Sequence, residues 1–179
     1  MIIAGIDYSL TSPAICVLNG KKWKWENLTF HFLTDKPTKA TTFMGNIHGE
    51  RLSEWGADEE RYCSIADWAR EIVLPCEEIS LEGYSYGSKG KVFHIAENTG
   101  VLKYKLWKDA KPISIYPPQQ VKKFATTKGN ATKDLMYEHF VRETNKQIMY
   151  SIMPKSTKVG NPVSDIVDAY YICKKLYYE

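Results

Sequence analysis

Short apolar runs alternate with turn-forming clusters at the start of the chain. The run over residues 2–6 is β-branched in character and predicts a buried strand that ends at Asp7. Turn-forming residues occupy 9–13, and a second apolar run over 14–18 is closed by an Asn-Gly pair. We therefore expect a hairpin with a carboxylate at its mouth.

The next segment continues the strand pattern and then loses it. Aromatic and apolar residues alternate with polar ones over 22–33, which predicts a third strand interrupted near Glu26 and Asn27. Three strands in this order form an antiparallel meander. Residues 35–58 have no sustained periodicity, and we expect a long loop there.

A helix and a fourth strand follow. Asp58 is a plausible N-cap, helical spacing of apolar residues continues from it, and Pro75 stops the helix. Residues 78–83 alternate and predict a strand that ends at Glu82. A strand that follows a helix favours parallel pairing with right-handed crossover, and pairing with the first strand would bring Glu82 beside Asp7. The alternative is an ordinary strand-end glutamate that reaches solvent.

The second half of the chain is mostly helical. Gly100, inside a predicted helix, suggests close packing against the sheet. The last helix begins with Asn161 as N-cap and Pro162 at its first position. The pattern predicts helices over 91–107, 119–125, 131–145 and from 161 onward, a fifth strand over 111–116, a turn over 126–130 and a polar linker over 154–161.

Composition limits the class of protein. With 179 residues, 44% of them hydrophobic and 25% charged, the chain suits a single domain over residues 1–179. Its four cysteines form no close pair, which argues against a zinc site or a disulfide framework and favours a reduced setting. No basic segment precedes the first apolar run, and no run approaches the roughly 20 apolar residues of a membrane span. We expect a cytoplasmic protein with no membrane partner.

The net charge of +3 conceals a segregation of sign along the chain. Residues 50–82 hold ten acids and three arginines, whereas residues 84–133 hold ten lysines and two acids. This distribution favours a protein that acts on a polyanion through bound cations, although solvated helix faces would give the same counts.

Three acidic positions carry the candidate chemistry. Asp165 and Asp168, three residues apart, share one helix face, and their repulsion destabilises a helix that gains nothing from it. The helix dipole explains Asp165 and only weakly Asp168, whereas a shared divalent cation explains both. Asp7 could hold such a cation or could cap its own turn, and its own segment favours the cap.

Taken with Glu82, these acids fall in an order that resembles the ribonuclease-H-like nucleases, and RuvC-type Holliday junction resolvases within them. The matching stretches are Gly5-Ile6-Asp7-Tyr8-Ser9-Leu10-Thr11, Leu81-Glu82, Gln120-Val121-Lys122, Gly129-Asn130-Ala131-Thr132-Lys133 and Ser164-Asp165-Ile166-Val167-Asp168-Ala169. They span nearly the whole chain. The third-strand region with its loop, and the sequence just after Glu82, depart from the family pattern.

The resemblance implies a ribonuclease-H-like α/β fold: a five-stranded mixed sheet, three antiparallel strands then two parallel ones, with helices on both faces. It implies that Asp7, Glu82, Asp165 and Asp168 are catalytic metal ligands for two Mg²⁺ ions, with Mn²⁺ as a substitute. It further implies a homodimer that cleaves four-way DNA junctions, a phage or prophage relative acting in the host cytoplasm.

The residues expected to meet DNA are basic or aromatic. Lys122 and Lys133 match basic positions near the cleaved phosphate. We expect the loop over 84–91 to be mobile in the free protein and to open the junction centre by stacking on unpaired bases. The alternative is that its tyrosines pack the loop onto the following helix, which suits Tyr84 as well as stacking does, whereas stacking is favoured for Tyr86. The full expected DNA-binding set is Tyr84, Tyr86, Lys89, Lys91, Lys122, Lys123, Lys128 and Lys133.

Three other functions fit part of the pattern. One is a related nuclease that acts on flaps, forks or RNA-DNA hybrids, and another is a branched-DNA-binding module without catalysis. The third is a sugar-kinase or actin-like ATPase, faintly suggested by Gly5-Ile6-Asp7. The chain is too short for two such domains, and it has no second glycine-rich phosphate loop. We therefore expect no nucleotide cofactor.

Overall fold

A mixed β-sheet of seven strands forms the centre of the computed structural model, which describes residues 1–84 and 92–179. The strands are β1 (Ile2–Asp7), β2 (Ala14–Asn19), β3 (Leu28–Thr34), β4 (Thr42–Phe43), β5 (Ile47–Arg51), β6 (Glu78–Glu82) and β7 (Ile113–Tyr116). Their order across the sheet is β4-β5-β3-β2-β1-β6-β7.

The five predicted strands are present with the predicted directions. β1, β2 and β3 form the antiparallel meander, β6 pairs parallel with β1, and β7 pairs parallel with β6. In the β1–β6 register Ile6 lies opposite Leu81. The residues that follow, Asp7 and Glu82, therefore end neighbouring strands at the same edge of the sheet.

The prediction of five strands was wrong in number, because the expected loop over 35–58 contains β4 and β5. β5 pairs parallel with β3 and places Ile47 against the core, fully buried. Of the five residues of β5, only Ile47 and Gly49 are buried, and β4 has two residues in all. Strands so short and so polar at their ends have no sequence periodicity: β5 forms by pairing with β3, and β4 forms by pairing with β5.

The third strand also differs from its prediction. It begins at Leu28, after a 3-10 turn η1 (Trp25–Asn27), so the tryptophans before it do not alternate on a strand. Trp23 donates from Nε1 to the Tyr170 hydroxyl at 3.0 Å, and Trp25 packs beside Phe30. Tertiary aromatic contacts account for these residues better than strand periodicity does.

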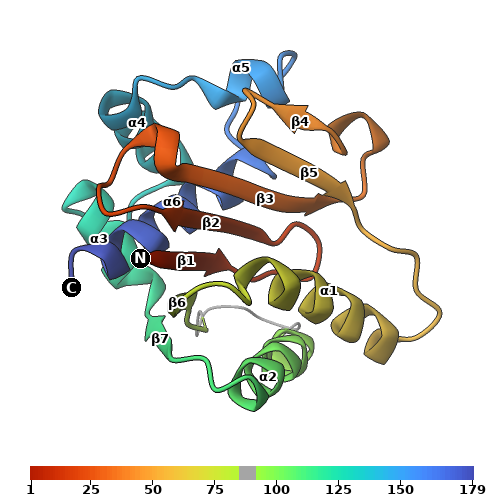
Figure 1. Cartoon of the computed structure of the whole chain (residues 1–179). Coiled ribbons are helices and arrows are strands. Elements are labelled where there is room, and N and C mark those ends of the chain that lie inside the picture. Colours follow the sequence, from red (N-terminus) through yellow and green to blue (C-terminus); the bar gives the residue numbers. More distant parts are fainter. Residues whose placement is uncertain (85–91) are drawn as a thin grey trace.

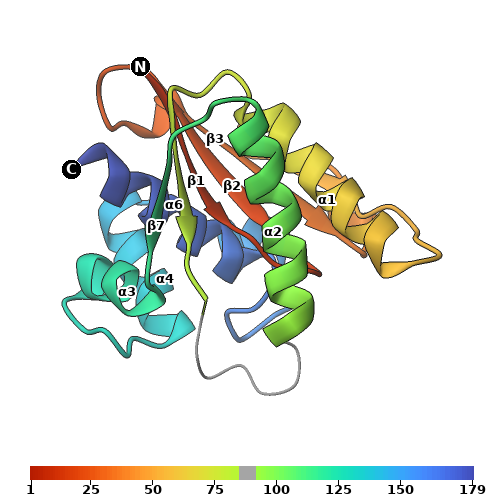
Figure 2. The same ribbon diagram turned by 90° about the horizontal axis from the view of Figure 1, so that it is seen from below.

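Helices cover both faces of the sheet, as predicted (Figures 1 and 2). They are α1 (Asp58–Val73), α2 (Val92–Lys108), α3 (Pro118–Thr126), α4 (Lys133–Thr144), α5 (Ile148–Ile152) and α6 (Val163–Tyr177), with a second 3-10 turn η2 (Pro37–Lys39). α1 and α2 lie on one face, and α6 lies on the other with α3 and α4 beside it. The short α5 was not predicted.

Two helix starts differ from the sequence expectation. Ala57 rather than Asp58 holds the cap position of α1, and Pro162 rather than Asn161 holds that of α6. The Asn161 side chain instead accepts a hydrogen bond from Lys133, 3.1 Å away. The sequence cannot show that a polar side chain next to a helix is engaged by a residue 28 positions away.

The central helix α6 is buried along almost its whole length. Phe30, Phe140 and Tyr170 pack in the core on its side of the sheet, while Ile65 and Leu102 belong to the core under α1 and α2. A helix buried in this way has little freedom to shift. It therefore fixes the position of whatever its first turn carries.

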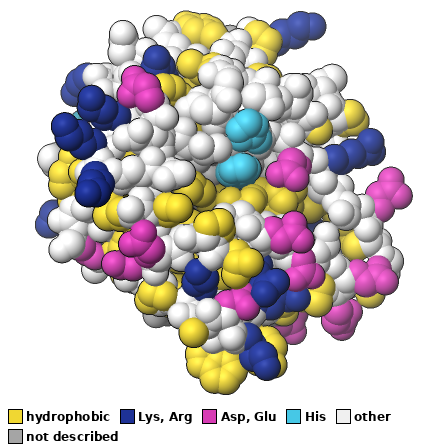
Figure 3. Space-filling view, in the orientation of Figure 1, with side chains coloured by type: hydrophobic (Ala, Val, Ile, Leu, Met, Phe, Trp, Pro, Cys, Tyr) yellow, Lys and Arg dark blue, Asp and Glu magenta, His cyan; other side chains and the backbone are white. Residues whose placement is uncertain are grey.

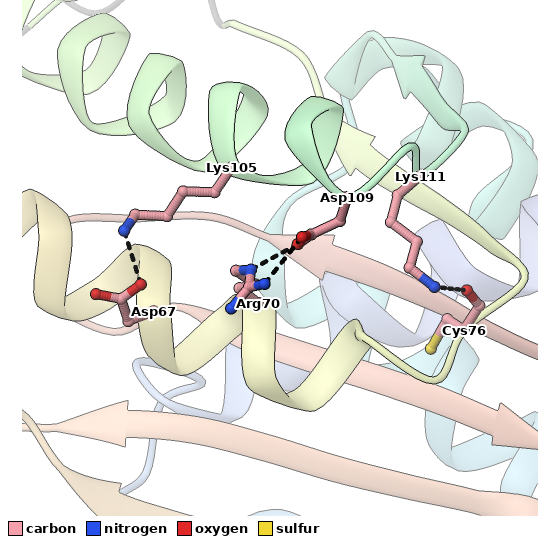
Figure 4. Close-up of polar contacts among 6 residues, drawn as sticks. All are labelled: Asp67, Arg70, Cys76, Lys105, Asp109 and Lys111. Atoms are coloured by element: carbon pink, nitrogen blue, oxygen red, sulfur yellow. Dashed lines mark hydrogen bonds and ion pairs between the residues drawn. The ribbon is translucent and has the colours of Figure 1, made fainter.

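Ion pairs join α1 to α2, as Figure 4 shows. Arg70 donates from Nε and Nη2 to the two carboxylate oxygens of Asp109 at 2.5 and 2.8 Å, and Lys105 donates to Asp67 at 2.7 Å. The acid-rich and lysine-rich segments thus partly neutralise each other in space. Their separation along the sequence overstates the polarity of the molecule.

The surface retains some of the segregation. In the view of Figure 3, many acidic side chains gather on the right, the side of α1 in Figure 1, and several lysine and arginine side chains gather at the left edge. None of the helices formed by residues 1–84 and 92–179 has the length and apolar character needed to cross a membrane.

Gly5 allows β1 and α6 to approach closely. A Cβ atom added at Gly5 would lie 2.1 Å from the backbone nitrogen of Cys173 and 2.7 Å from the carbonyl oxygen of Ala169. These are backbone atoms, so no side-chain rotation relieves the clash. The helix would have to move away from the strand that carries Asp7.

Gly5→Ala should therefore destabilise the protein by about 1–3 kcal/mol or more, as overpacking does. Gly100→Ala is the matched control, because a Cβ at this helical position meets nothing within 4 Å. That open space also corrects the expectation that Gly100 packs against the sheet. The control should be neutral or stabilising by up to about 1 kcal/mol. Urea unfolding of both variants tests this, and equal stabilities would contradict it.

Candidate active site

Four acidic side chains come from three elements that meet at one edge of the sheet. Asp7 ends β1, Glu82 ends β6, and Asp165 and Asp168 lie in the first two turns of α6. The β1–β6 register aligns the first two, and the close packing of α6 on β1 at Gly5 brings the helix to them. The structure thus brings together all four predicted acids.

The pKa values of these acids report their mutual proximity. Burial raises the pKa of Asp7 well above its ordinary value, and the charges of Asp165, Glu82 and Asp168 raise it further. Burial, followed by the charge of Asp168, raises the pKa of Glu82 to about 7. Burial and then the charge of Asp165 raise that of Asp168 to about 7. The cluster holds more negative charge than its surroundings neutralise.

Two lysines face the cluster. The charge of Lys122 lowers the pKa values of Glu82 and Asp168, and that of Lys133 acts in the same sense on Asp7 and Asp168. Both lysines were predicted to lie near the reacting phosphate, and both lie beside the acids.

Lys133 is held in place by hydrogen bonds. Its Nζ donates to Asn161 Oδ1 and to Ser164 Oγ, each at 3.1 Å. The Ser164 hydroxyl lies 3.2 Å from Asp165 Oδ1 and can donate to it. One hydroxyl therefore links a lysine to a buried carboxylate, a role that the sequence pattern alone did not reveal.

The donor set suits a hard divalent cation. Asp165 is 6% exposed, and its Oδ2 and the buried Ser12 Oγ have no hydrogen-bond partner within the described residues. The Ser12 hydroxyl still lies close enough to favour the charged form of Asp165 and lower its pKa, against the larger effect of burial. An oxygen ligand set with an unsatisfied buried oxygen fits Mg²⁺ or Mn²⁺.

The side chains of the four acids are not arranged around a single metal-binding position. Within residues 1–84 and 92–179, no three His, Cys, Asp or Glu side chains are arranged to enclose a metal as they stand. Side-chain rotation of Asp7, Glu82 and Asp168, which are each partly exposed, would be needed to close the set. The residues that could hold a metal are these three and Asp165.

The other predicted DNA-binding residues lie around this centre or beyond the described part. Tyr84 follows β6 and is 43% exposed, and Lys123 and Lys128 are exposed on α3 and the turn after it. Tyr86, Lys89 and Lys91, and with them most of the proposed junction-opening loop over 84–91, lie outside the described residues.

A cavity of about 660 Å³ adjoins the acids. Asp7 and Glu82 contribute to its lining, together with residues of the β1–β2 turn and the first turns of α1 and α2. Arg61 also lines it and was not predicted as a site residue. The only sequence signal was an arginine within an acid-rich helix.

No family model and no curated protein sequence matches this chain. Several solved structures, by contrast, match the chain. Thermus thermophilus RuvC is 20% identical, with 99% of this chain and 95% of that chain covered and a TM-score of 0.61. T. thermophilus RuvC in complex with Holliday junction substrate is 17% identical, with 99% and 94% covered and a TM-score of 0.64. The Fowlpox virus resolvase in complex with substrate Holliday junction DNA is 15% identical, with 99% and 97% covered and a TM-score of 0.52. At these identities the likeness establishes that this chain shares the fold of these proteins.

The raised pKa values predict how stability depends on pH without divalent cations. Glu82 and Asp168 bind protons more tightly in the folded chain, with pKa values of about 7, than at their ordinary values of 4.5 and 3.8. Folding is therefore favoured at low pH, and this advantage is lost as pH rises through about 7. The melting temperature in EDTA should fall between about pH 5 and pH 8.

Asp168→Asn supplies the control for this prediction. It removes one repelling charge, so the variant should melt above the wild type at about pH 8, with a difference that shrinks towards pH 5. Differential scanning fluorimetry across this range measures both effects. Parallel curves for the two proteins would contradict the origin assigned to the pH dependence.

Proposed function

We propose that this chain is a metal-dependent endonuclease that resolves four-way DNA junctions by hydrolysing phosphodiester bonds. The observation that carries the proposal is the cluster of four carboxylates at the ends of β1 and β6 and the start of α6, on a fold shared with Holliday junction resolvases. Both the RuvC complex and the fowlpox resolvase complex contain Holliday junction DNA. Unneutralised acids beside lysines suit a site that binds cations and phosphate together.

In this proposal Asp7, Glu82, Asp165 and Asp168 hold two Mg²⁺ ions, which Mn²⁺ can replace. When bound, such ions activate water and stabilise the leaving oxygen in phosphodiester hydrolysis. The fold must keep the four carboxylates ionised and directed towards the metal-binding position. Burial opposes ionisation, and Lys122 and Lys133 favour it.

The lysines also serve the substrate. Lys122 and Lys133 neutralise the phosphates that flank the cleaved bond, and the exposed Lys123 and Lys128 extend the basic surface along α3. Ser164 and Asn161 fix the Lys133 ammonium, so less of its side-chain freedom is lost on binding. Tyr84, which follows β6 and is exposed, is suited to stack on an unpaired base.

Asp7→Asn should abolish cleavage of a four-way junction and preserve binding. Loss of an outer partner of a metal ligand alone can cost about 10- to 100-fold in activity, so loss of a ligand should cost more than about 100-fold. The lysines that supply most of the affinity remain. The measurements are nick mapping on end-labelled junction, flap, fork, duplex and RNA-DNA hybrid substrates with Mg²⁺, and binding by electrophoretic mobility shift.

Asp35→Asn, the same change on the exposed segment after β3, is the control and should cleave normally. Cleavage by Asp7→Asn at the wild-type rate would remove the site assignment. If the wild type cleaves flaps, forks or hybrids in preference to junctions, the proposed hydrolysis at these acids is supported and the proposed junction substrate is contradicted. If it binds junctions and cleaves nothing with Mg²⁺ or Mn²⁺, the chain is a binding module.

The same proposal includes a homodimer, which would present two sites to a two-fold symmetric substrate. An apolar stripe on the outer face of α2 supports it: Phe93, Tyr104 and Trp107 are 82%, 60% and 70% exposed. Their spacing of 11 and 3 residues places them on one side of the helix, with Gly100 between them. Large exposed aromatic residues in a row are typical of a protein interface.

Trp107→Lys should convert the dimer to a monomer in sedimentation velocity experiments and slow paired cleavage of the two junction strands. Tyr150→Lys is the control, because Tyr150 is equally exposed, at 66%, but lies on α5. A wild-type protein that sediments as a monomer even when bound to a junction would contradict the dimer. A Trp107→Lys dimer would place the interface elsewhere.

A further inference from the structure

Arg61 is a cation whose hydrogen-bonding capacity is largely unused. Its Nη2 donates to the carbonyl oxygen of Leu10 at 2.6 Å, and its guanidinium lies 4.1 Å from the centre of the Trp55 ring. Its Nε is buried without a hydrogen-bond partner within residues 1–84 and 92–179. Arg70, on the same helix, instead donates two hydrogen bonds to Asp109.

Within the described part of the chain, Arg61 also makes no ion pair, whereas Arg70 pairs with Asp109 and Arg142 with Glu138. A buried guanidinium nitrogen without a partner is costly. A planar guanidinium that stacks on an aromatic ring and retains free N–H groups is suited to bind a phosphate.

Arg61 lines the cavity that adjoins the acids, with Asp7 and Glu82 in the same lining. The volume of about 660 Å³ falls within the range of about 300–1,000 Å³ that is typical of small-molecule sites. Such a space has room for one nucleotide and none for a duplex. A base must leave its stack to enter it, which costs least where pairing is already broken.

The rest of the lining suits a nucleobase. Leu10 and Ile95 supply apolar surface, and Tyr84 supplies an exposed aromatic ring at the same cavity. The Tyr62 hydroxyl and His94 Nδ1, 2.8 Å apart, provide polar groups for a base edge. The remaining acid of the lining is Asp58, whose Oδ2 lies 3.6 Å from His94 Nδ1.

We propose that Arg61 and this cavity form a subsite for one unpaired nucleotide of the DNA strand next to the cleaved bond. Arg61 binds the phosphate of that nucleotide, and its base lies between α1 and α2. The proposal rests on the proposed function, since it places the nucleotide of a nuclease substrate beside the catalytic acids. In this proposal the α1 side of the site recognises unpaired DNA, and the lysines of α3 and α4 lie on the other side of the acids.

The phosphate contact is tested by the salt dependence of junction binding, measured by fluorescence anisotropy in the Asp7→Asn background without cleavage. Loss of one phosphate contact should lower the slope of log Kd against log salt by about 0.7 to 0.9. Arg61→Gln should show this change. Arg142→Gln, which removes the same charge from an exposed pair on α4, should show none. A purely structural role for Arg61 would lower the melting temperature and leave the slope unchanged.

The base is tested with 2-aminopurine placed on either side of the mapped nick. An unstacked 2-aminopurine brightens, so binding of the Asp7→Asn protein should raise its fluorescence several-fold at one of these positions. Ile95→Trp, which fills the cavity without changing charge, should abolish the rise and retain the wild-type salt slope. This second variant keeps the test decisive if Arg61→Gln does not fold.

The outcomes separate the subsite from the proposed function. A reduced salt slope with no change in 2-aminopurine fluorescence would show that Arg61 contacts paired DNA and would overturn the nucleotide subsite. Equal slopes for Arg61→Gln and Arg142→Gln would overturn it as well. Absence of any junction cleavage by the wild type would instead defeat the proposed function, whereas the salt-dependence test of Arg61 needs no cleavage because it uses the Asp7→Asn protein.

Discussion

The repulsion among four closely spaced carboxylates is the constraint on which the rest of this structure depends. Asp7 and the α6 acids would separate if the fold allowed it, because burial and like charge both raise the free energy of their ionised forms. Gly5 prevents the separation by letting α6 lie directly on β1. The almost complete burial of α6 then keeps the helix from moving. Packing energy from the core thus holds charges where electrostatics alone would not.

The two faces of the sheet contribute different parts of the site. On one face, α6 positions the acids. The hydroxyl of Ser80 in β6 lies 3.1 Å from the carbonyl oxygens of Ala4 in β1 and Ile172 in α6, and its hydrogen bonds link the two strands to the helix. On the other face, α1 and α2 are joined by the Arg70–Asp109 pair and leave a cavity at their first turns. The backbone positions of the α6 acids are therefore set on one face of the sheet, and the cavity on the other face adjoins the site through Asp7 and Glu82.

How much of this could be predicted from the sequence follows from the range of the interactions involved. β1, β6 and α6 have clear local patterns, and the rule for strand-helix-strand crossovers favoured a parallel pairing that places Glu82 beside Asp7 if the partner is β1, which is the pairing that the structure has. β4 and β5 could not be predicted, because they are short and form only through tertiary pairing, β5 with β3 and β4 with β5. Arg61 could not be found either. Its distinguishing feature, a buried nitrogen without a partner, has no counterpart in the linear sequence.

The same electrostatics couples the components that the proposed reaction needs. With pKa values of about 7, Glu82 and Asp168 are partly protonated at neutral pH, so a cation that binds them must displace protons. A phosphate that approaches the ionised acids alone would be repelled, and Lys122 and Lys133 offset only part of that charge. Cations and DNA should therefore each favour binding of the other, since each relieves a repulsion that the other experiences. On the proposed function, a site built in this way should not cleave DNA until the cation is present.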